Sequence, residues 1–174
     1  MSAPVKFHLC CGLDYRPGFI NVDDLEGGPQ DVRANLNGPW TFAADASADH
    51  ILIKDGLEHL KSVEAFLSEA SRVLVPGGTL EIQVPHFRSP SAYRLTHLHF
   101  FSWSYFDVFP EPHDAVRDFR VITNELVVEK KFPFNVLNTV ANLVPKFWER
   151  ALYVSGLRVV LEKLAGDANA KRAS

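Results

Sequence analysis

One stretch of the chain, residues 48–82, restricts the fold more than any other. Residues 50–53 form a short apolar run of strand length, and apolar residues then recur at helical spacing. Ser62 precedes that second pattern as a helix N-cap. Pro76-Gly77-Gly78 ends it, because proline cannot continue a helix and glycine accepts a positive φ. Residues 79–84 then alternate as a strand, so the stretch predicts a β-α-β unit.

The first 23 residues predict two strands with an unusually short connection. Residues 5–9 are strand-like and lead into Cys10-Cys11-Gly12, and residues 19–23 end in Asp23. A nucleotide-binding β-α-β unit places its acid about 20 residues after the glycines, because a helix lies between them. Here Asp23 follows Gly12 by 11 positions, and Pro17-Gly18 lies in the gap. We therefore expect a loop or a single turn there.

The order of Gly12, Asp23, Glu58-His59 and Pro76-Gly77-Gly78 resembles the class I S-adenosylmethionine-dependent methyltransferases of the small type 11 kind. In that family, a strand ending in "LEH" leads into a helix that closes with "RVLxPGG". The resemblance implies an α/β fold with a Rossmann-like, mostly parallel sheet and an antiparallel final strand. The first crossover helix would be shortened or absent, and a helical C-terminal extension would follow.

The same resemblance implies S-adenosylmethionine as cofactor and S-adenosylhomocysteine as product. The backbone at Cys11 and Gly12 would approach the cofactor, and Asp23 would bind its ribose hydroxyls. Asn35-Leu36 stands where the family has a "DL" pair on the adenine side, and Asp55 would complete the cofactor residues. The plainer interpretations are that Gly12 is an ordinary turn residue and Asp23 an ordinary strand-end acid.

Glu58-His59 is the candidate catalytic pair, because it follows the strand that ends at Ile53. A methyl acceptor that is acidic needs little beyond positioning, whereas a hydroxyl or amine acceptor needs a base to remove its proton. The alternative is that both residues only organise the loop. With Asp55 and His99, the pair also resembles the ligands of metal-dependent O-methyltransferases, which would imply Mg²⁺, Mn²⁺ or Zn²⁺. A packing or hydrogen-bonding role for the histidines is favoured over a divalent metal, because short motifs often mislead.

Beyond residue 84 the sequence predicts smaller elements. Residues 85–90 read as a loop at the carboxyl end of a strand, where open parallel sheets bind ligands. Ser102 or Ser104 would cap a short helix, and residues 120–122 and 125–132 would form two strands.

The domain division places a methyltransferase-like domain at 1–133, a helical extension at 134–164 and a disordered tail at 165–174. The extension would hold one helix ending near Pro145 and another from Pro145 to Leu164. Two roles for it are open. A lid or homodimer face is favoured over peripheral contact with membrane lipid or a lipid-linked substrate, because amphipathic helices mostly face a core.

Composition limits the function classes. The net charge of −3 provides no basic field for nucleic acid. No apolar run reaches ~18 residues, so no transmembrane helix is expected. The two cysteines are adjacent, which suits a reducing cytoplasm. The sequence thus predicts methyl transfer to a small molecule or to a glycan or lipid precursor. The alternative is a degenerate methyltransferase fold that acts as a binding or scaffold module.

Overall fold

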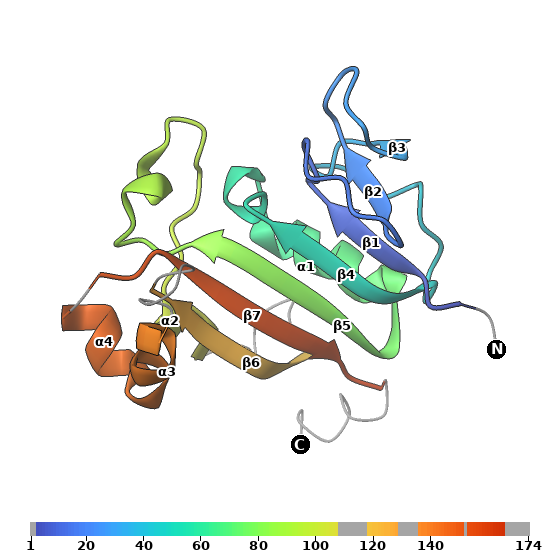
Figure 1. Cartoon of the computed structure of the whole chain (residues 1–174). Coiled ribbons are helices and arrows are strands. Elements are labelled where there is room, and N and C mark those ends of the chain that lie inside the picture. The colour runs from blue at the N-terminus through green and yellow to red at the C-terminus, as the bar shows by residue number, and fades with distance from the viewer. Residues whose placement is uncertain (1–2, 108–117, 129–135, 152, 166–174) are drawn as a thin grey trace.

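A computed structural model describes residues 3–107, 118–128, 136–151 and 153–165 of the chain (Figure 1). Strands and short helices follow one another in an α/β order. In chain order they are β1 (Lys6–Leu9), β2 (Ile20–Asp23), β3 (Val32–Arg33), β4 (Ala48–Lys54), η1 (Leu57–His59), α1 (Val63–Val73), β5 (Leu74–Pro85), η2 (Pro90–Tyr93), α2 (Trp103–Asp107), β6 (Phe119–Val127), α3 (Val136–Leu143), α4 (Pro145–Ala151) and β7 (Gly156–Lys163).

The strands form one seven-stranded sheet in the order β3-β2-β1-β4-β5-β7-β6. Neighbours from β3 to β5 pair in parallel, whereas β7 is antiparallel to both β5 and β6. The predicted fold class, a mostly parallel sheet with an antiparallel final strand, is confirmed. None of the helices in the described part of the chain is long and apolar enough to cross a membrane.

The connection between β1 and β2 contains no helix, as the sequence predicts. The buried side chain of Asn21 organises this loop instead. Its Oδ1 accepts the backbone N–H of Arg16 at 2.9 Å, and its Nδ2 donates to the carbonyl oxygens of Arg16 and Phe19. Asp31 supports the arrangement by accepting the backbone N–H of Asn21 at 2.7 Å. A hydrogen-bonded loop thus replaces the first crossover helix.

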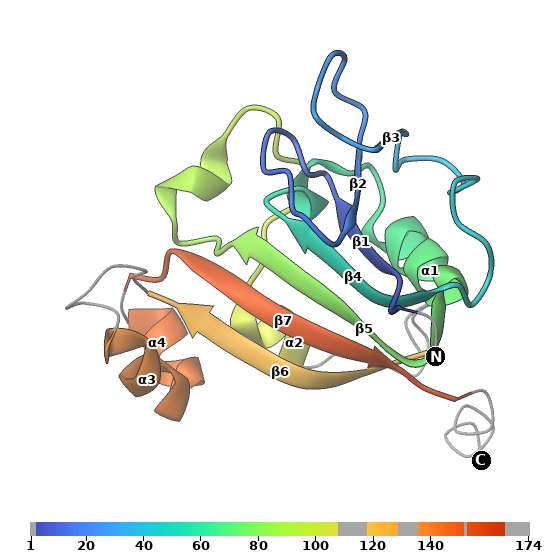
Figure 2. The same cartoon turned by 45° about the vertical axis from the view of Figure 1, so that its right-hand side comes forward.

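Helix α1 covers one face of the sheet behind β4 and β5 (Figures 1 and 2). The Ser62 hydroxyl accepts the backbone N–H of Ala65 at 3.0 Å, which confirms the predicted N-cap. The buried side of α1 packs on inward-facing residues of β4 and β5. This core includes Phe66, Leu67, Ala70, Val73, Ile51, Ile53, Leu80 and Ile82.

No helix of the described residues covers the opposite face of β5 and β7 (Figures 1 and 2). Polar side chains occupy it instead. Arg158 on β7 donates to Glu81 on β5 at 2.8 Å and lies 3.3 Å from Glu125 on β6. Nδ1 of His50 lies 2.8 Å from Oγ1 of Thr79. The predicted alternation of residues 79–84 therefore separates an apolar core face from a polar open face.

Several expectations for the C-terminal half need correction. Residues 156–163 form strand β7, so the predicted helix from Pro145 to Leu164 ends at Ala151. Every second residue from Leu157 to Leu161 is buried in the core, which is the period of a strand. Pairing of β7 with β5 on one side and β6 on the other favours the strand over a helix.

The two strands expected at 120–122 and 125–132 are one strand, β6, with an irregularity between Val121 and Thr123; residues 129–132 lie outside the described part. Strand β5 begins at Leu74, so α1 ends three residues before Pro76. Two expectations are confirmed. Ser102 caps α2 by accepting the backbone N–H of Tyr105 at 2.9 Å, and α3 ends at Leu143, just before Pro145. The predicted tail, 165–174, lies outside the described residues except for Ala165.

Candidate functional site

The turns that follow β1 and β4 pack directly against each other. Cys10 and Asp55, the first residues after these strands, both have a positive φ, as does Gly12. A Cβ on Gly56 would lie 2.4 Å from the Cβ of Cys10, so only glycine allows this contact. A positive φ is uncommon for residues other than glycine and often marks a functional turn.

Asp23 fixes the turn after β1 from the neighbouring strand. Its Oδ2 accepts the backbone N–H of Gly12 at 2.8 Å, and its Oδ1 accepts that of Leu25 at the same distance. Each carboxylate oxygen keeps a further lone pair for an incoming hydroxyl. A Cβ on Gly12 would meet no atom within 4 Å, so space is open above that backbone. These residues therefore fit a ligand that offers hydroxyl groups and approaches the main chain.

The remaining predicted cofactor residues have different environments. Cys11 is buried, and its backbone N–H donates to the carbonyl of Val22 at 3.2 Å. Asn35 is exposed and donates to Asp24 at 3.2 Å, one residue beyond Asp23. Leu36 is only 7% exposed and belongs to the hydrophobic core. Burial raises the pKa of the Cys10 thiol to about 12, so this thiol is neutral and a poor nucleophile.

Glu58 and His59 lie on the 3-10 turn η1, directly after the β4 turn. Glu58 is 1% exposed, and its Oε2 is buried without a hydrogen-bond partner among the described residues. Burial, with a smaller contribution from the charge of Asp55, raises the pKa of the Glu58 carboxyl to about 7. A carboxyl group with this pKa can take up a proton near neutral pH, as a general base must.

The segment 96–99 docks on η1 and brings a second histidine to the site. The backbone N–H of Leu98 donates to the carbonyl of Glu58 at 2.8 Å. The rings of His59 and His97 are 4.5 Å apart and nearly perpendicular. One ligand atom each from Glu58, His59 and His97 lie within 4.8 Å of one another. His99, which the sequence grouped with Glu58 and His59, instead places its Nε2 at 2.8 Å from the carbonyl of Leu60.

A cavity of about 820 Å³ opens beside this cluster, at the carboxyl ends of β4 and β5. The loop at 85–90 contributes to its wall, as its predicted place at a strand end implies. The cavity is lined by acidic, basic, imidazole and hydroxyl side chains, which suits a polar acceptor. These include Asp55, Glu58, His59, Ser89, Ser91, Arg94, His97, Tyr153, Ser155 and Arg158.

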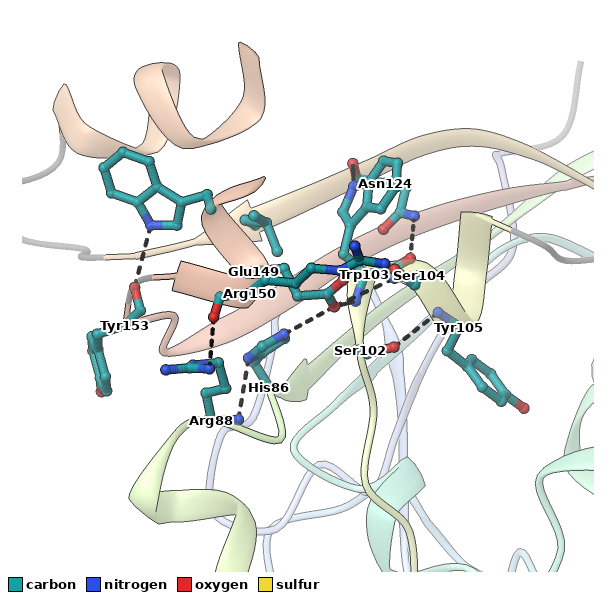
Figure 3. Close-up of polar contacts among 12 residues, drawn as sticks. His86, Arg88, Ser102, Trp103, Ser104, Tyr105, Asn124, Glu149, Arg150 and Tyr153 are labelled. Atoms are coloured by element: carbon teal, nitrogen blue, oxygen red, sulfur yellow. Dashed lines mark hydrogen bonds and ion pairs between the residues drawn. The ribbon is translucent and has the colours of Figure 1, made fainter. Parts of the chain in front are cut away.

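A buried hydrogen-bonded pair connects helix α4 to the loop that follows β5 (Figure 3). Nε2 of His86 lies 3.2 Å from Oε1 of Glu149, and both side chains are buried. Ser104 donates its hydroxyl to Oε2 of Glu149 at 2.7 Å, and the Trp103 backbone N–H donates to Oε1. Arg88 donates to the carbonyl of Arg150 at 3.1 Å. The C-terminal helices are thereby tied to a cavity-lining segment.

Sequence reasoning missed His97, Arg94, Tyr153 and Arg158. Only the placement of residues 85–90 at a strand end pointed to this part of the wall. His97 offered no distinctive spacing, because its position depends on the docking of segment 96–99 against η1. Tyr153 and Arg158 flank the start of β7, which was predicted as helix, so their place beside the cavity had no signal.

A family model described as a methyltransferase domain matches residues 2–82. No curated protein sequence matches the chain significantly. The solved structures provide matches over most of the chain, each with low sequence identity. A SAM-dependent methyltransferase from Archaeoglobus fulgidus has a TM-score of 0.65 and 15% identity, covering 93% of this chain and 87% of that one.

Two further structures agree with this match. An S-adenosylmethionine-dependent methyltransferase from Mesorhizobium loti has a TM-score of 0.59 and 13% identity, covering 91% of this chain and 90% of that one. A putative methyltransferase from Haloferax volcanii, in complex with the Trm112 methyltransferase activator, has a TM-score of 0.57 and 16% identity, covering 93% and 83%. The family model and the shared fold support a class I methyltransferase family for this chain, as the sequence predicts.

Proposed function

We propose that this chain transfers the methyl group of S-adenosylmethionine to a small molecule, or to a glycan or lipid precursor, bound in the cavity. The observation that carries the proposal is the convergence of the β1, β2 and β4 turns. Asp23 holds the Gly12 N–H at 2.8 Å, and Gly56 touches Cys10. In open parallel sheets, ligands bind beyond the carboxyl ends of the strands, where these turns lie.

Each predicted residue has a role in this proposal. Asp23 accepts the ribose hydroxyls, and the backbone at Cys11 and Gly12 receives the amino-acid end of the cofactor. Asn35 and Leu36 serve the adenine side, Asn35 by hydrogen bonding and Leu36 from the core. Asp55 stands between the cofactor turn and the cavity, which it lines. The bound cofactor supplies an electrophilic methyl group next to a sulfonium, and the protein positions the acceptor in line with it.

Glu58 and His59 are the proposed acid-base pair, with His99 as a further candidate. Glu58 has a pKa of about 7 and lines the cavity, so it can take a proton from an acceptor hydroxyl or amine. The contact of the His99 Nε2 with Leu60 gives His99 a positioning task within this proposal, because it holds the segment that carries His97.

Calorimetry with S-adenosylmethionine and S-adenosylhomocysteine tests the proposal. The wild-type chain should bind both saturably. Asp23→Ala should weaken binding by about 1–3 kcal/mol, because a charged acceptor is lost. The exposed Glu26→Ala on the following loop is the matched control and should keep the wild-type affinity. Equal affinities for Asp23→Ala and wild type would remove Asp23 from the site.

A scaffold module without catalysis is the second candidate. Cys10 favours it, because a residue with a side chain takes a positive φ in a turn where the family uses glycine. The missing crossover helix also removes the helix N-terminus that usually supports such a ligand. The absence of binding at millimolar cofactor would decide for the scaffold.

Partners and location complete the proposal. Both cysteines are free thiols, which suits a reducing cytoplasm. Leu143, Val144 and Phe147 at the α3–α4 turn are exposed apolar side chains. This turn is the place where a second copy of the chain, or a membrane carrying a lipid-linked acceptor, would make contact. Light scattering and vesicle sedimentation distinguish a dimer from a membrane-bound monomer.

A further inference from the structure

The two histidines beside Glu58 each place Nδ1 against a main-chain carbonyl oxygen. Nδ1 of His59 lies 3.1 Å from the carbonyl oxygen of Thr96, and Nδ1 of His97 lies 2.9 Å from that of Ala92. A carbonyl oxygen can only accept a hydrogen bond, so each Nδ1 carries the proton of a neutral ring. Each Nε2 is therefore left with a lone pair. Histidines that bind a metal through one ring nitrogen usually donate the other N–H to a carbonyl or carboxylate, as both Nδ1 atoms do here.

Glu58 supplies the negative charge that such a pair requires. Its side chain is buried, and its Oε2 has no hydrogen-bond partner among the described residues. A buried carboxylate with one oxygen unpaired is costly unless a cation or donor compensates it. A carboxylate oxygen of Glu58 and one nitrogen from each ring lie within 4.8 Å of one another. Ligand atoms around zinc, bound at about 2.0–2.1 Å, lie roughly 3–3.5 Å apart, so small side-chain rotations suffice.

We propose that Glu58, His59 and His97 form a binding site for a divalent transition-metal ion, best matched by zinc, on the wall of the cavity. Two imidazoles with one carboxylate favour zinc and its neighbours, whereas magnesium and calcium prefer oxygen ligands. His99 is not part of the group whose ligand atoms lie within 4.8 Å of one another, and its Nε2 contacts the Leu60 carbonyl. It braces the segment that carries His97.

Three protein ligands leave an open coordination position, as in catalytic rather than structural zinc sites. All three residues line the cavity of about 820 Å³, so an acceptor there can reach that position. The substrate class is then a hydroxyl-bearing molecule whose oxygen binds the metal. This assignment of the acceptor rests on the proposed function, whereas the metal site does not.

The metal would lower the pKa of the bound hydroxyl. With the ion bound, Glu58 and His59 would act as its ligands in place of the acid-base role, so the hydroxyl proton would pass to water and the oxygen would attack the methyl carbon of the sulfonium. The new C–O bond would form as the C–S bond breaks, and the electron pair of the C–S bond would return to sulfur, which would leave S-adenosylhomocysteine and the methyl ether.

The test titrates Zn²⁺ and Co²⁺ into the full chain, without a His-tag and after removal of chelator. We expect one ion per chain by elemental analysis after dialysis, a raised melting temperature with Zn²⁺, and a visible absorption band with Co²⁺. His97→Gln and Glu58→Gln should each lose at least ten-fold in affinity. His50→Gln, a histidine outside the cavity lining whose Nδ1 lies 2.8 Å from Oγ1 of Thr79, is the control and should keep wild-type metal affinity.

Circular dichroism establishes that each variant is folded, and the two ligand variants act as independent checks. A wild-type melting temperature that Zn²⁺ leaves unchanged, or equal metal affinity in His97→Gln and His50→Gln, would overturn the site. Cofactor calorimetry in the presence of chelator keeps the two proposals apart. Cofactor binding without any metal binding refutes only the metal site, and metal binding without cofactor binding refutes only methyl transfer.

Discussion

Removing the Glu149 carboxylate should destabilise the fold more than any surface substitution. Burial raises the pKa of this carboxyl, but hydrogen bonds from Ser104, His86 and Trp103 outweigh burial and hold it below its ordinary value. Burial lowers the pKa of His86. The pair is therefore an anionic Glu149 and a neutral His86 whose Nε2–H donates to Oε1 (Figure 3). Nδ1 of His86 accepts the Arg88 N–H at 3.2 Å, which agrees with this tautomer.

The magnitude follows from the donors that would be left unpaired. Glu149→Ala removes the acceptor for the Ser104 hydroxyl, the Trp103 N–H and His86, all held in a part-buried or buried setting. A buried donor left without a partner costs about 1–3 kcal/mol, and three donors lose their acceptor here, so the total loss should be at least about 3 kcal/mol. Glu149→Gln keeps one acceptor oxygen and should cost about 1–3 kcal/mol. The larger loss is a substantial share of a domain stability of about 5–15 kcal/mol.

Urea unfolding followed by tryptophan fluorescence measures these losses in the free energy of unfolding. Trp103 donates its backbone N–H to Glu149, and Trp148 is the residue before Glu149, so both report on this region. Glu26→Ala, an exposed acid in a 3.9 Å surface contact with Arg33, is the control and should change stability by less than about 0.5 kcal/mol. If Glu149→Ala unfolds at the same urea concentration as the control, the assignment of a stabilising buried network is wrong.

Three further outcomes are expected. Burial lowers the pKa of His86 in the folded protein, whereas this histidine binds a proton near pH 6.5 in the unfolded chain. The free energy of unfolding should therefore fall as the pH drops below 6.5. Urea midpoints should show a smaller drop in His86→Asn. Burial raises the pKa of both Cys10 and Cys11, so neither should react with iodoacetamide at neutral pH until urea is added. Asn21→Ala should weaken cofactor binding in calorimetry, because Asn21 holds the loop after β1; unchanged affinity would contradict that positioning role.

Local sequence signals predicted those parts of the fold that local chemistry decides. Pro17-Gly18 excluded a helix in the first crossover, and Ser62 marked the start of α1. Strand β7 was missed because Pro145 and scattered apolar residues suggested a continuing helix, whereas pairing with β5 and β6 determines the outcome. The same limit applies to the site. Asp23 accepts the Gly12 N–H, a contact that the strand order alone did not specify. His97, and not His99, lies with Glu58 and His59, because long-range docking of segment 96–99 selects between the two histidines.

The missing crossover helix and the polar open face of the sheet have one physical cause. Strands of a parallel sheet that helices cover on both faces read as continuous apolar runs, whereas β5 alternates from Thr79 to Val84. Its outward side chains satisfy one another across the sheet, as Glu81 and Arg158 do. Where the loop after β1 folds back, Phe19 packs against His8 and His50 and covers part of that face. The chain can therefore dispense with a helix on this side, and the cofactor turn must be held by Asn21 and Asp23 because no helix N-terminus supports it.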